Sequence, residues 1–179
     1  MFPTLETDRL ILREITKEDS EAIFSSFSND EVTRYYGQDP FVNIGEAEKI
    51  IDIFATNYVE KRGIRWGIQR KDNGKIIGTI GFHAWFHKHK RAEIGYEIQP
   101  DYWRKGYTQE AILKIISYGF EEMDLTRIGA VVFTENEASI KLLTKIGFQK
   151  EGLLKDYMYQ NGKPHDTYIY SLVKNDDLI

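Results

Sequence analysis

The spacing of the hydrophobic residues changes repeatedly along this chain, and this change restricts the fold more than any other feature. Residues 44–58 place apolar side chains at helical intervals, whereas Ile64, Trp66 and Ile68 alternate with polar residues as in a strand. The same analysis along all 179 residues predicts strands at 9–15, 64–68, 76–82, 92–98 and 128–134, helices at 16–27, 44–58, 109–123 and 136–146, and a final two-stranded hairpin turning at Asn161-Gly162. We therefore expect one mixed α+β domain, residues 1–179, with about seven strands and four helices.

Composition excludes several classes of function. The chain has no cysteine, so disulfides, a thiolate nucleophile and cysteine-based metal sites are ruled out. A net charge of −4 argues against a nucleic-acid partner. The N-terminus lacks the pattern of a leader, and no apolar run approaches the ~18 residues of a membrane span, so we expect a cytoplasmic protein without a membrane partner. No G-x-x-x-x-G-K-[ST] motif is present, which excludes a P-loop nucleotide site.

A basic loop with one glycine joins the predicted strand 92–98 to the next helix. It reads Trp103-Arg104-Lys105-Gly106-Tyr107-Thr108-Gln109. Unpaired amides and the positive end of the dipole at the helix start, with the two cations, predict an anion site that would accept a pyrophosphate. The alternative is an ordinary strand–helix turn with two solvated cations.

Three ordered motifs carry a family resemblance. The segments 92–98, 103–111 and 136–148, together with the opening residues 5–13, resemble the GNAT superfamily of N-acetyltransferases, in particular its RimJ/RimL-like branch. The resemblance implies a GNAT-like fold with a twisted, mostly antiparallel sheet that splays between its fourth and fifth strands. Acetyl-CoA would lie in that gap, and no metal would be required.

The resemblance also implies which residues hold the cofactor. Pantetheine would run beside β-strand residues Glu97, Ile98 and Gln99. Trp103 and Thr108 depart from the superfamily pattern, and the Thr108 hydroxyl is expected to cap the helix. Asn136 is expected to cap the next helix and to touch CoA. The full predicted cofactor set is Glu97, Ile98, Gln99, Arg104, Lys105, Gly106, Tyr107, Thr108, Gln109, Asn136 and Ser139.

The catalytic residues are Glu93 and Ser139 by the same resemblance. Glu93 matches a glutamate that acts as general base in some relatives, although it could equally be a structural carboxylate bonded to a neighbouring strand. Leu143 occupies the position of the tyrosine that many members use as the acid for the thiolate. Ser139 matches the serine given that role in the RimL-like branch, and its alternative is a first-turn serine that bonds backbone donors.

Substrate-binding residues are predicted around the mouth of the site: Tyr35, Tyr36, His83, Trp85 and Tyr96. A metal site at His83, His87 and His89 is the alternative for that loop, but neighbouring cations make a solvated loop the better interpretation. The branch implies a protein N-terminal α-amine as acceptor, such as that of a ribosomal protein. Small amines such as polyamines or antibiotics, and a non-catalytic acetyl-CoA sensor, are the alternatives, and either a monomer or a homodimer fits the sequence.

Overall fold

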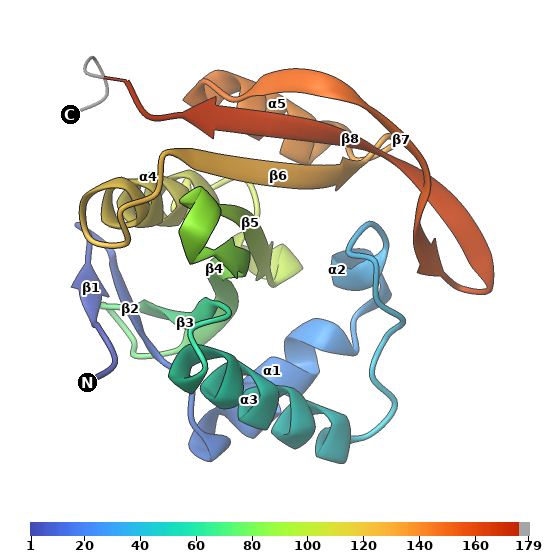
Figure 1. The fold of residues 1–179 in the computed structure, drawn as a ribbon. Helices are drawn as coiled ribbons and strands as arrows, with labels where there is room; N and C mark the ends of the chain where they lie inside the picture. The colour runs from blue at the N-terminus through green and yellow to red at the C-terminus, as the bar shows by residue number, and fades with distance from the viewer. Residues whose placement is uncertain (176–179) are drawn as a thin grey trace.

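The computed structural model describes residues 1–175, and its strands form a single eight-stranded sheet in the order β1-β2-β3-β4-β5-β6-β8-β7 (Figure 1). Every neighbouring pair is antiparallel except β5 and β6, which are parallel. The strands are β1 (Leu5–Glu6), β2 (Leu10–Glu14), β3 (Ile64–Arg70), β4 (Ile76–Phe86), β5 (Arg91–Ile98), β6 (Arg127–Phe133), β7 (Gln149–Gln160) and β8 (Lys163–Val173).

Five α-helices and three short 3-10 helices accompany the sheet within the described residues. The α-helices are α1 (Ser20–Phe27), α2 (Asp30–Thr33), α3 (Ile44–Val59), α4 (Tyr107–Glu121) and α5 (Glu137–Ile146). The 3-10 helices are η1 (Lys17–Asp19), η2 (His87–His89) and η3 (Pro100–Tyr102). None of the helices between residues 1 and 175 combines the length and the apolar character needed to cross a bilayer.

The sheet opens between β5 and β6. Their ladder joins only residues 91–93 of β5 to residues 127–129 of β6, although β5 continues to Ile98 and β6 to Phe133. Beyond Glu93 the two strands diverge, which leaves one edge of residues 94–98 without a partner strand (Figure 1). The expected splay between the fourth and fifth predicted strands is therefore confirmed.

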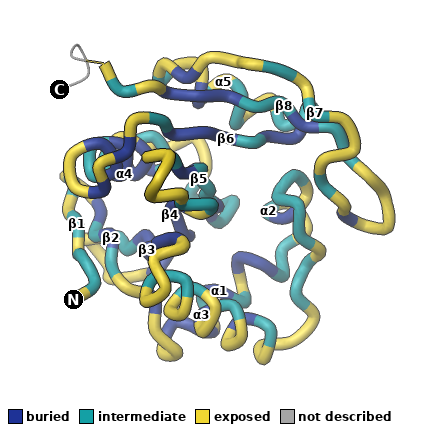
Figure 2. Tube along the Cα trace, viewed as in Figure 1, coloured by how far each residue is buried: buried dark blue, intermediate teal, exposed yellow. Residues whose placement is uncertain are grey.

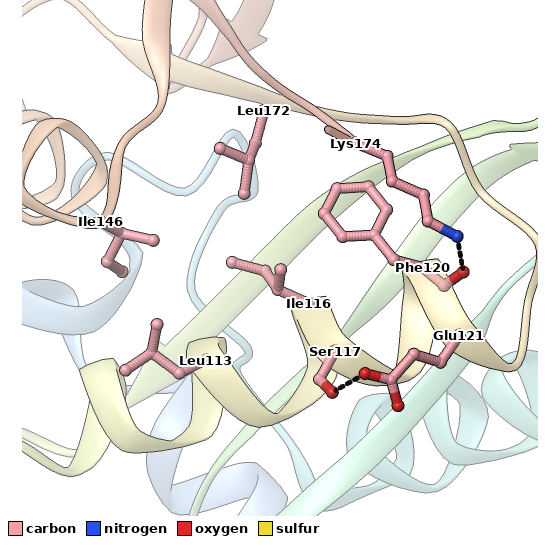
Figure 3. A pocket seen from close by; sticks show the side chains of 8 residues that line it. All are labelled: Leu113, Ile116, Ser117, Phe120, Glu121, Ile146, Leu172 and Lys174. Atoms are coloured by element: carbon pink, nitrogen blue, oxygen red, sulfur yellow. Dashed lines mark hydrogen bonds between the residues drawn. The ribbon is translucent and has the colours of Figure 1, made fainter. Parts of the chain in front are cut away.

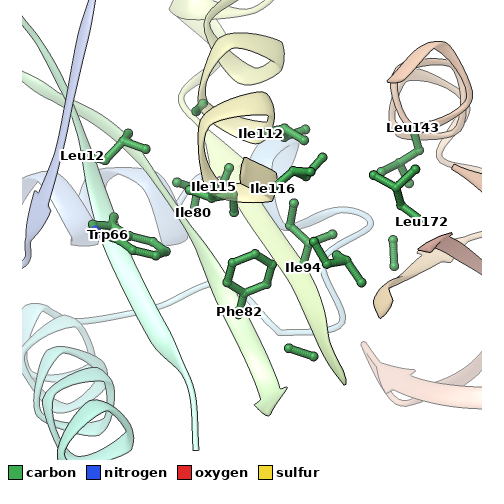
Figure 4. Close-up of a cluster of buried hydrophobic side chains, with 14 of the residues drawn as sticks. Leu12, Trp66, Ile80, Phe82, Ile94, Ile112, Ile115, Ile116, Leu143 and Leu172 are labelled. Carbon is green, nitrogen blue, oxygen red and sulfur yellow. The ribbon is translucent and has the colours of Figure 1, made fainter. Parts of the chain in front are cut away.

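The two faces of the sheet differ in chemistry because side chains alternate along each strand. Trp66, Ile80, Phe82 and Ile94 pack with helix α4 in the main core (Figure 4). The opposite face carries polar side chains from β3, β4 and β5 and lies towards α1 and α3, which enclose a second, smaller core. Burial follows this arrangement, with the middle strands dark and the tip of the β7–β8 hairpin exposed (Figure 2).

Local signals place the ends of several elements. Asn43 and Glu46 form the capping box of α3, and Gly147 ends α5 in the left-handed region at φ +116°. Asn161 and Gly162 both have positive φ, as the predicted hairpin turn requires. At the start of the predicted helix 16–27, the Thr16 amide donates a hydrogen bond to the Asp19 carboxylate at 2.9 Å. In the structure this predicted helix is divided into η1 and α1.

The structure differs from the predicted element count in two places. β1 is only two residues long, too short for a period to be recognised, and it makes the sheet eight-stranded rather than seven-stranded. Helix α2 has four residues and adds a fifth helix. β4 also continues past the predicted end at Phe82 to Phe86, through an irregularity at Ala84, which has φ +47°.

Candidate active site

The N-terminus of α4 forms a cradle of unpaired amides. Gly106 is its N-cap at φ +82°, and Arg104 also has positive φ. The first bond of the helix runs from the Glu110 amide to the Gly106 carbonyl at 3.1 Å, and within residues 1–175 no acceptor bonds the amides of residues 104–109. These amides and the helix dipole fit a pyrophosphate, as the sequence indicated.

The turn between β1 and β2 fixes this cradle from behind. The Glu110 carboxylate accepts hydrogen bonds from the Arg9 amide and Nε, each at 2.8 Å, and from the Thr7 hydroxyl at 2.5 Å. Burial tends to raise the pKa of Glu110, but the hydrogen bonds from Thr7 and Arg9 together lower it. Arg9 Nη1 also donates to the Lys105 carbonyl at 2.9 Å. The sequence did not reveal this support, because it joins residues about a hundred positions apart.

Side chains of the loop take roles other than phosphate binding. Trp103 Nε1 donates to the Ile98 carbonyl at 2.8 Å, which ties the loop to the end of β5. Tyr107 is buried beneath the Arg9 guanidinium, 4.2 Å from the centre of its ring. The expectation that Thr108 caps α4 is wrong, because Gly106 is the N-cap and no side chain bonds there.

The end of β5 directs its polar side chains towards α1. Gln99 Nε2 donates to Ser26 Oγ at 3.2 Å, and the Gln99 amide donates to the Ile77 carbonyl at 2.8 Å. Glu97 is 5% exposed, and neither of its carboxylate oxygens has a hydrogen-bond partner within the described residues. Burial raises the pKa of Glu97 to about 7, against smaller opposing effects of Thr79, Arg65 and Ser26. The predicted pairing with pantetheine would therefore use backbone groups of residues 97–99, of which the Gln99 amide and the Ile98 carbonyl already have partners.

A tyrosine and a serine meet on the α4 and α5 side of the sheet. The hydroxyls of Tyr96 and Ser139 lie 2.5 Å apart, and Asn136 caps α5 by accepting from the Ser139 amide at 3.3 Å. Burial raises the pKa of Tyr96 to about 12, although the bond to Ser139 opposes this, so the phenol keeps its proton at neutral pH. Leu143 is 1% exposed and packs in the core near Leu172 (Figure 4).

A histidine and a glutamate meet on the opposite face, where the sheet opens. His83 and Glu93 are directly opposite each other in the β4–β5 ladder, with Nε2 and Oε2 3.2 Å apart. Glu93 is also the last residue of β5 that pairs with β6. The hydrogen bond with His83 lowers the pKa of Glu93, with help from nearby Arg91 and Arg127 and against its partial burial.

Arg65 lies on the same face, and the sequence analysis did not identify it. Its Nη2 donates to the Tyr36 hydroxyl at 2.6 Å and its Nε to Thr79 Oγ1 at 2.9 Å. Tyr36 therefore reaches this face from the loop after α2, as expected of a substrate residue. The sequence signal that could have identified Arg65 was its position between Ile64 and Trp66, since a polar residue between buried ones on a strand faces the opposite side.

Other predicted substrate residues do not join this group. Trp85 packs against the main core and stacks on His87, with ring centres 4.0 Å apart, and Tyr35 lies beside Phe133. Tyr96 is on the other face, with Ser139. His87 Nε2 lies 2.8 Å from the Lys61 carbonyl, and in residues 1–175 no three His, Cys, Asp or Glu side chains are placed to hold a metal ion.

A small cavity of about 150 Å³ lies elsewhere, between α4 and the strand β8 (Figure 3). It shares no residue with the predicted cofactor or acceptor sets. The Lys174 ammonium at its rim donates to the Phe120 carbonyl at 3.0 Å. It is lined by Leu113, Ile116, Ser117, Phe120, Glu121, Ile146, Leu172 and Lys174.

An anion cradle beside an opened pair of parallel strands, with polar groups on both faces of β5, defines a CoA-dependent acyltransferase. Comparison with known proteins specifies the class. Residues 9–149 match the family model described as an acetyltransferase (GNAT) domain, and the chain belongs to this family. It is an acetyl-CoA-dependent N-acetyltransferase, and the unpaired amides at α4 fit the cosubstrate.

Three curated relatives cover most of the chain. The uncharacterised N-acetyltransferase YoaA of Bacillus subtilis is 64% identical, over 97% of this chain and 98% of its own. YdaF of the same species, named as a candidate ribosomal N-acetyltransferase, is 29% identical over 98% and 97% of the two chains. Spermidine N(1)-acetyltransferase of Escherichia coli is 28% identical over 85% and 79%.

Solved structures share the fold. The microcin C7 self-immunity acetyltransferase MccE, in complex with acetyl-CoA and AMP, superposes with a TM-score of 0.84 at 25% identity. The match covers 94% of each chain.

Proposed function

We propose that the acceptor is the α-amine of a protein N-terminus, of the ribosomal-protein type, and that it attacks directly within a ternary complex. The observation that carries this proposal is the contact of Glu93 with His83, whose Nε2 lies 3.2 Å from Glu93 Oε2 and which lowers the pKa of Glu93. A carboxylate with a low pKa is a weak base. An α-amine, with an ordinary pKa of ~7.7–8.0 against ~10.4 for lysine, needs the least help to lose its proton.

Two further features support this acceptor. The Arg65 guanidinium on the acceptor face would repel a polycation such as spermidine and would donate a hydrogen bond to a peptide carbonyl. The name of the relative YdaF points the same way, whereas the spermidine acetyltransferase is the relative that represents the alternative. The absence of cysteine removes the strongest nucleophile for an acetyl-enzyme, which favours direct attack.

The residues divide into three tasks in this proposal. The amides of residues 104–109 and the cap Asn136 hold acetyl-CoA, which supplies an activated acetyl group as its thioester. Glu93 assists the removal of a proton from the acceptor amine, on the face that holds Tyr36 and Arg65. Ser139, bonded to Tyr96, provides a proton on the sulfur side.

Release of free CoA thiol from acetyl-CoA tests the acceptor. Suitable amines are Ala- and Ser-initiated peptides, an N-blocked lysine peptide and spermidine, all at pH 7.5. An α-amine is about one-third unprotonated at this pH and a lysine amine about one part in a thousand, so we expect kcat/KM to be about 10²-fold higher for the free N-termini. Faster turnover of spermidine would contradict the proposal, and no thiol release with any amine would favour a sensor.

A further inference from the structure

The pairing of His83 with Glu93 suggests a different division of labour from the one the sequence indicated. We infer that His83 is the group that takes the proton from the acceptor amine, and that Glu93 is the positioning residue that orients its ring. The inference rests on the proposed function, because it names the base at the same acceptor face.

The orientation of the imidazole follows from its contact with Glu93. His83 Nε2 lies 3.2 Å from the ionised carboxylate, which can only accept, so this nitrogen carries the hydrogen. In the neutral ring the other nitrogen, Nδ1, then holds the free lone pair. Glu93 thus fixes the tautomer of His83 and stabilises the cation that forms when Nδ1 gains a proton.

The edge of the His83 ring that carries the free nitrogen lies over Gly95. His83 Nδ1 is 3.3 Å from the position that a Cβ atom at residue 95 would occupy, so a side chain there would press against the ring. Gly95 is two residues beyond Glu93, where β5 has already separated from β6. No group within residues 1–175 forms a hydrogen bond with Nδ1. An acceptor amine at the opening would therefore meet an unused base.

The charged groups around the ring come from three strands. Glu93 contacts it from β5, and Arg65 Nη1 from β3 lies 2.9 Å from the same Cβ position at Gly95. Arg91 and Arg127 lie near Glu93 and help to keep it ionised. Nδ1 and Arg65 Nη1 therefore both lie beside Gly95, so an amine and the carbonyl next to it in a peptide N-terminus would find partners on the same part of this face.

The step is balanced in atoms and electrons. The lone pair of the amine nitrogen forms the C–N bond to the acetyl carbon while the C–S bond breaks and its electron pair remains on sulfur. One proton passes from the amine nitrogen to His83 Nδ1, and one passes to sulfur from the Tyr96–Ser139 pair. The side chain of His83 is 55% exposed, so the ring can return its proton to water.

The kcat profile against pH distinguishes His83 from Glu93 as the base. Under the inference, His83→Gln lowers kcat by roughly 10²–10⁴-fold at pH 7.5 and removes the acid limb that the base produces. Glu93→Gln lowers kcat less and keeps the acid limb, because the ring loses its orienting partner but not its lone pair. His89→Gln, on the exposed helix η2, is the matched control and should leave the profile unchanged. An unaltered limb in His83→Gln, or its complete loss only in Glu93→Gln, would overturn the inference.

Ring ¹⁵N NMR of the unliganded protein gives a test that needs no acceptor. The four histidines can be assigned with His83→Gln, and at pH 8.5 the His83 signals should show hydrogen on Nε2 and none on Nδ1. Hydrogen on Nδ1 would overturn the inference whatever the kinetics show. If free N-termini prove not to be acceptors, the same variants are measured with spermidine, so a wrong acceptor and a wrong base give different results.

Discussion

At the residue scale, we expect Tyr96 to compensate for the leucine at position 143. Leu143 is buried in the core and has no proton to give, whereas the Tyr96 hydroxyl is bonded to Ser139 and stays protonated at neutral pH. If the pair protonates the thiolate, Ser139→Ala and Tyr96→Phe should each lower kcat by roughly 10²-fold without changing the Kd of acetyl-CoA. The double variant should be no worse than either single one, since the two hydroxyls act as a unit. Rapid-quench kinetics and calorimetry measure both quantities, and unchanged turnover would leave Ser139 as a helix residue only.

Glu97 makes stability depend on pH. Its pKa rises from 4.5 in the unfolded chain to about 7 in the fold, so folding favours the protonated form. The protonated Glu97 contributes its full share to the free energy of unfolding below pH 4.5. This contribution, up to about 3 kcal/mol, is lost as the pH rises through 7. Glu97→Gln cannot ionise, so its free energy of unfolding at pH 8 should exceed that of the wild type by at most this amount, with the difference shrinking towards pH 4.5. Urea titrations at both pH values test this, with the exposed Glu48→Gln as control. Equal differences at both pH values would refute it.

Single residues also show where sequence analysis ends. The capping role of Asn136 could be identified because it depends on a neighbour three positions away on one helix. The partner of Ser139 lies 43 positions earlier, and Arg65 meets Tyr36 across 29 positions. Such contacts depend on how strands are ordered in the sheet, which a local pattern does not contain.

At the scale of elements, the α4 cradle depends on the backbone of Gly106. Any other residue there would be strained at φ +82°, and its Cβ would lie 3.2 Å from Arg9 Nη2. We expect Gly106→Ala to raise the Kd of acetyl-CoA, Gly106→Val to raise it further, and Arg104→Ala to have a smaller effect because that side chain is exposed. Calorimetry checks the order.

The hairpin turn provides a matched control for this experiment. Gly162 has a similar φ of +71° and no atom within 4 Å of its Cβ position, so Gly162→Ala introduces similar strain far from the cradle. It should leave the Kd of acetyl-CoA unchanged. Small, equal effects at Gly106 and Gly162 would place the phosphates elsewhere.

The spacing of the hydrophobic residues located most of the helices and strands, because this spacing reflects the burial of one face of each element. The helix predicted at 44–58 is α3, and the strands predicted at 64–68 and 92–98 lie within β3 and β5. β1 and α2 span only about one period each, so they left no such signal. The irregular end of β4 depends on a positive φ at Ala84, which its sequence does not favour.

At the scale of the whole molecule, β5 separates the two halves of the chemistry. Tyr96 points to the side of α4 and α5, as does the cradle that fits the cosubstrate, and Glu93 and Gly95 belong to the face that His83, Arg65 and Tyr36 share. Strand alternation therefore puts the proposed acid and the proposed base on opposite sides of the opened sheet. The acceptor and acetyl-CoA can then approach the opening from different sides, as direct transfer requires.

The C-terminal hairpin closes the acceptor side by a contact between distant parts of the chain. Gln160 is 2% exposed, donates to the Thr33 carbonyl at 2.7 Å and accepts from the Gly37 amide at 2.9 Å. A third bond joins the Asn161 amide to the Asp39 carboxylate at 2.8 Å. These contacts hold the hairpin tip against the loop that carries Tyr36.

Gln160→Ala would leave the Gly37 amide without its partner, which costs about 1–3 kcal/mol unless water enters, and would leave the Thr33 carbonyl with only its bond from the Tyr36 amide at 3.0 Å. We expect the hairpin tip to release before the sheet unfolds, so that hydrogen exchange accelerates at the Gly37 amide but not in β3 or β4. The loop bearing Tyr36 would then be less ordered, and KM for the acceptor should rise more than kcat falls. Lys163→Ala, at the exposed turn, is the control and should change neither. Uniformly faster exchange across the sheet, with unchanged KM, would show that Gln160 stabilises the fold without shaping the acceptor side.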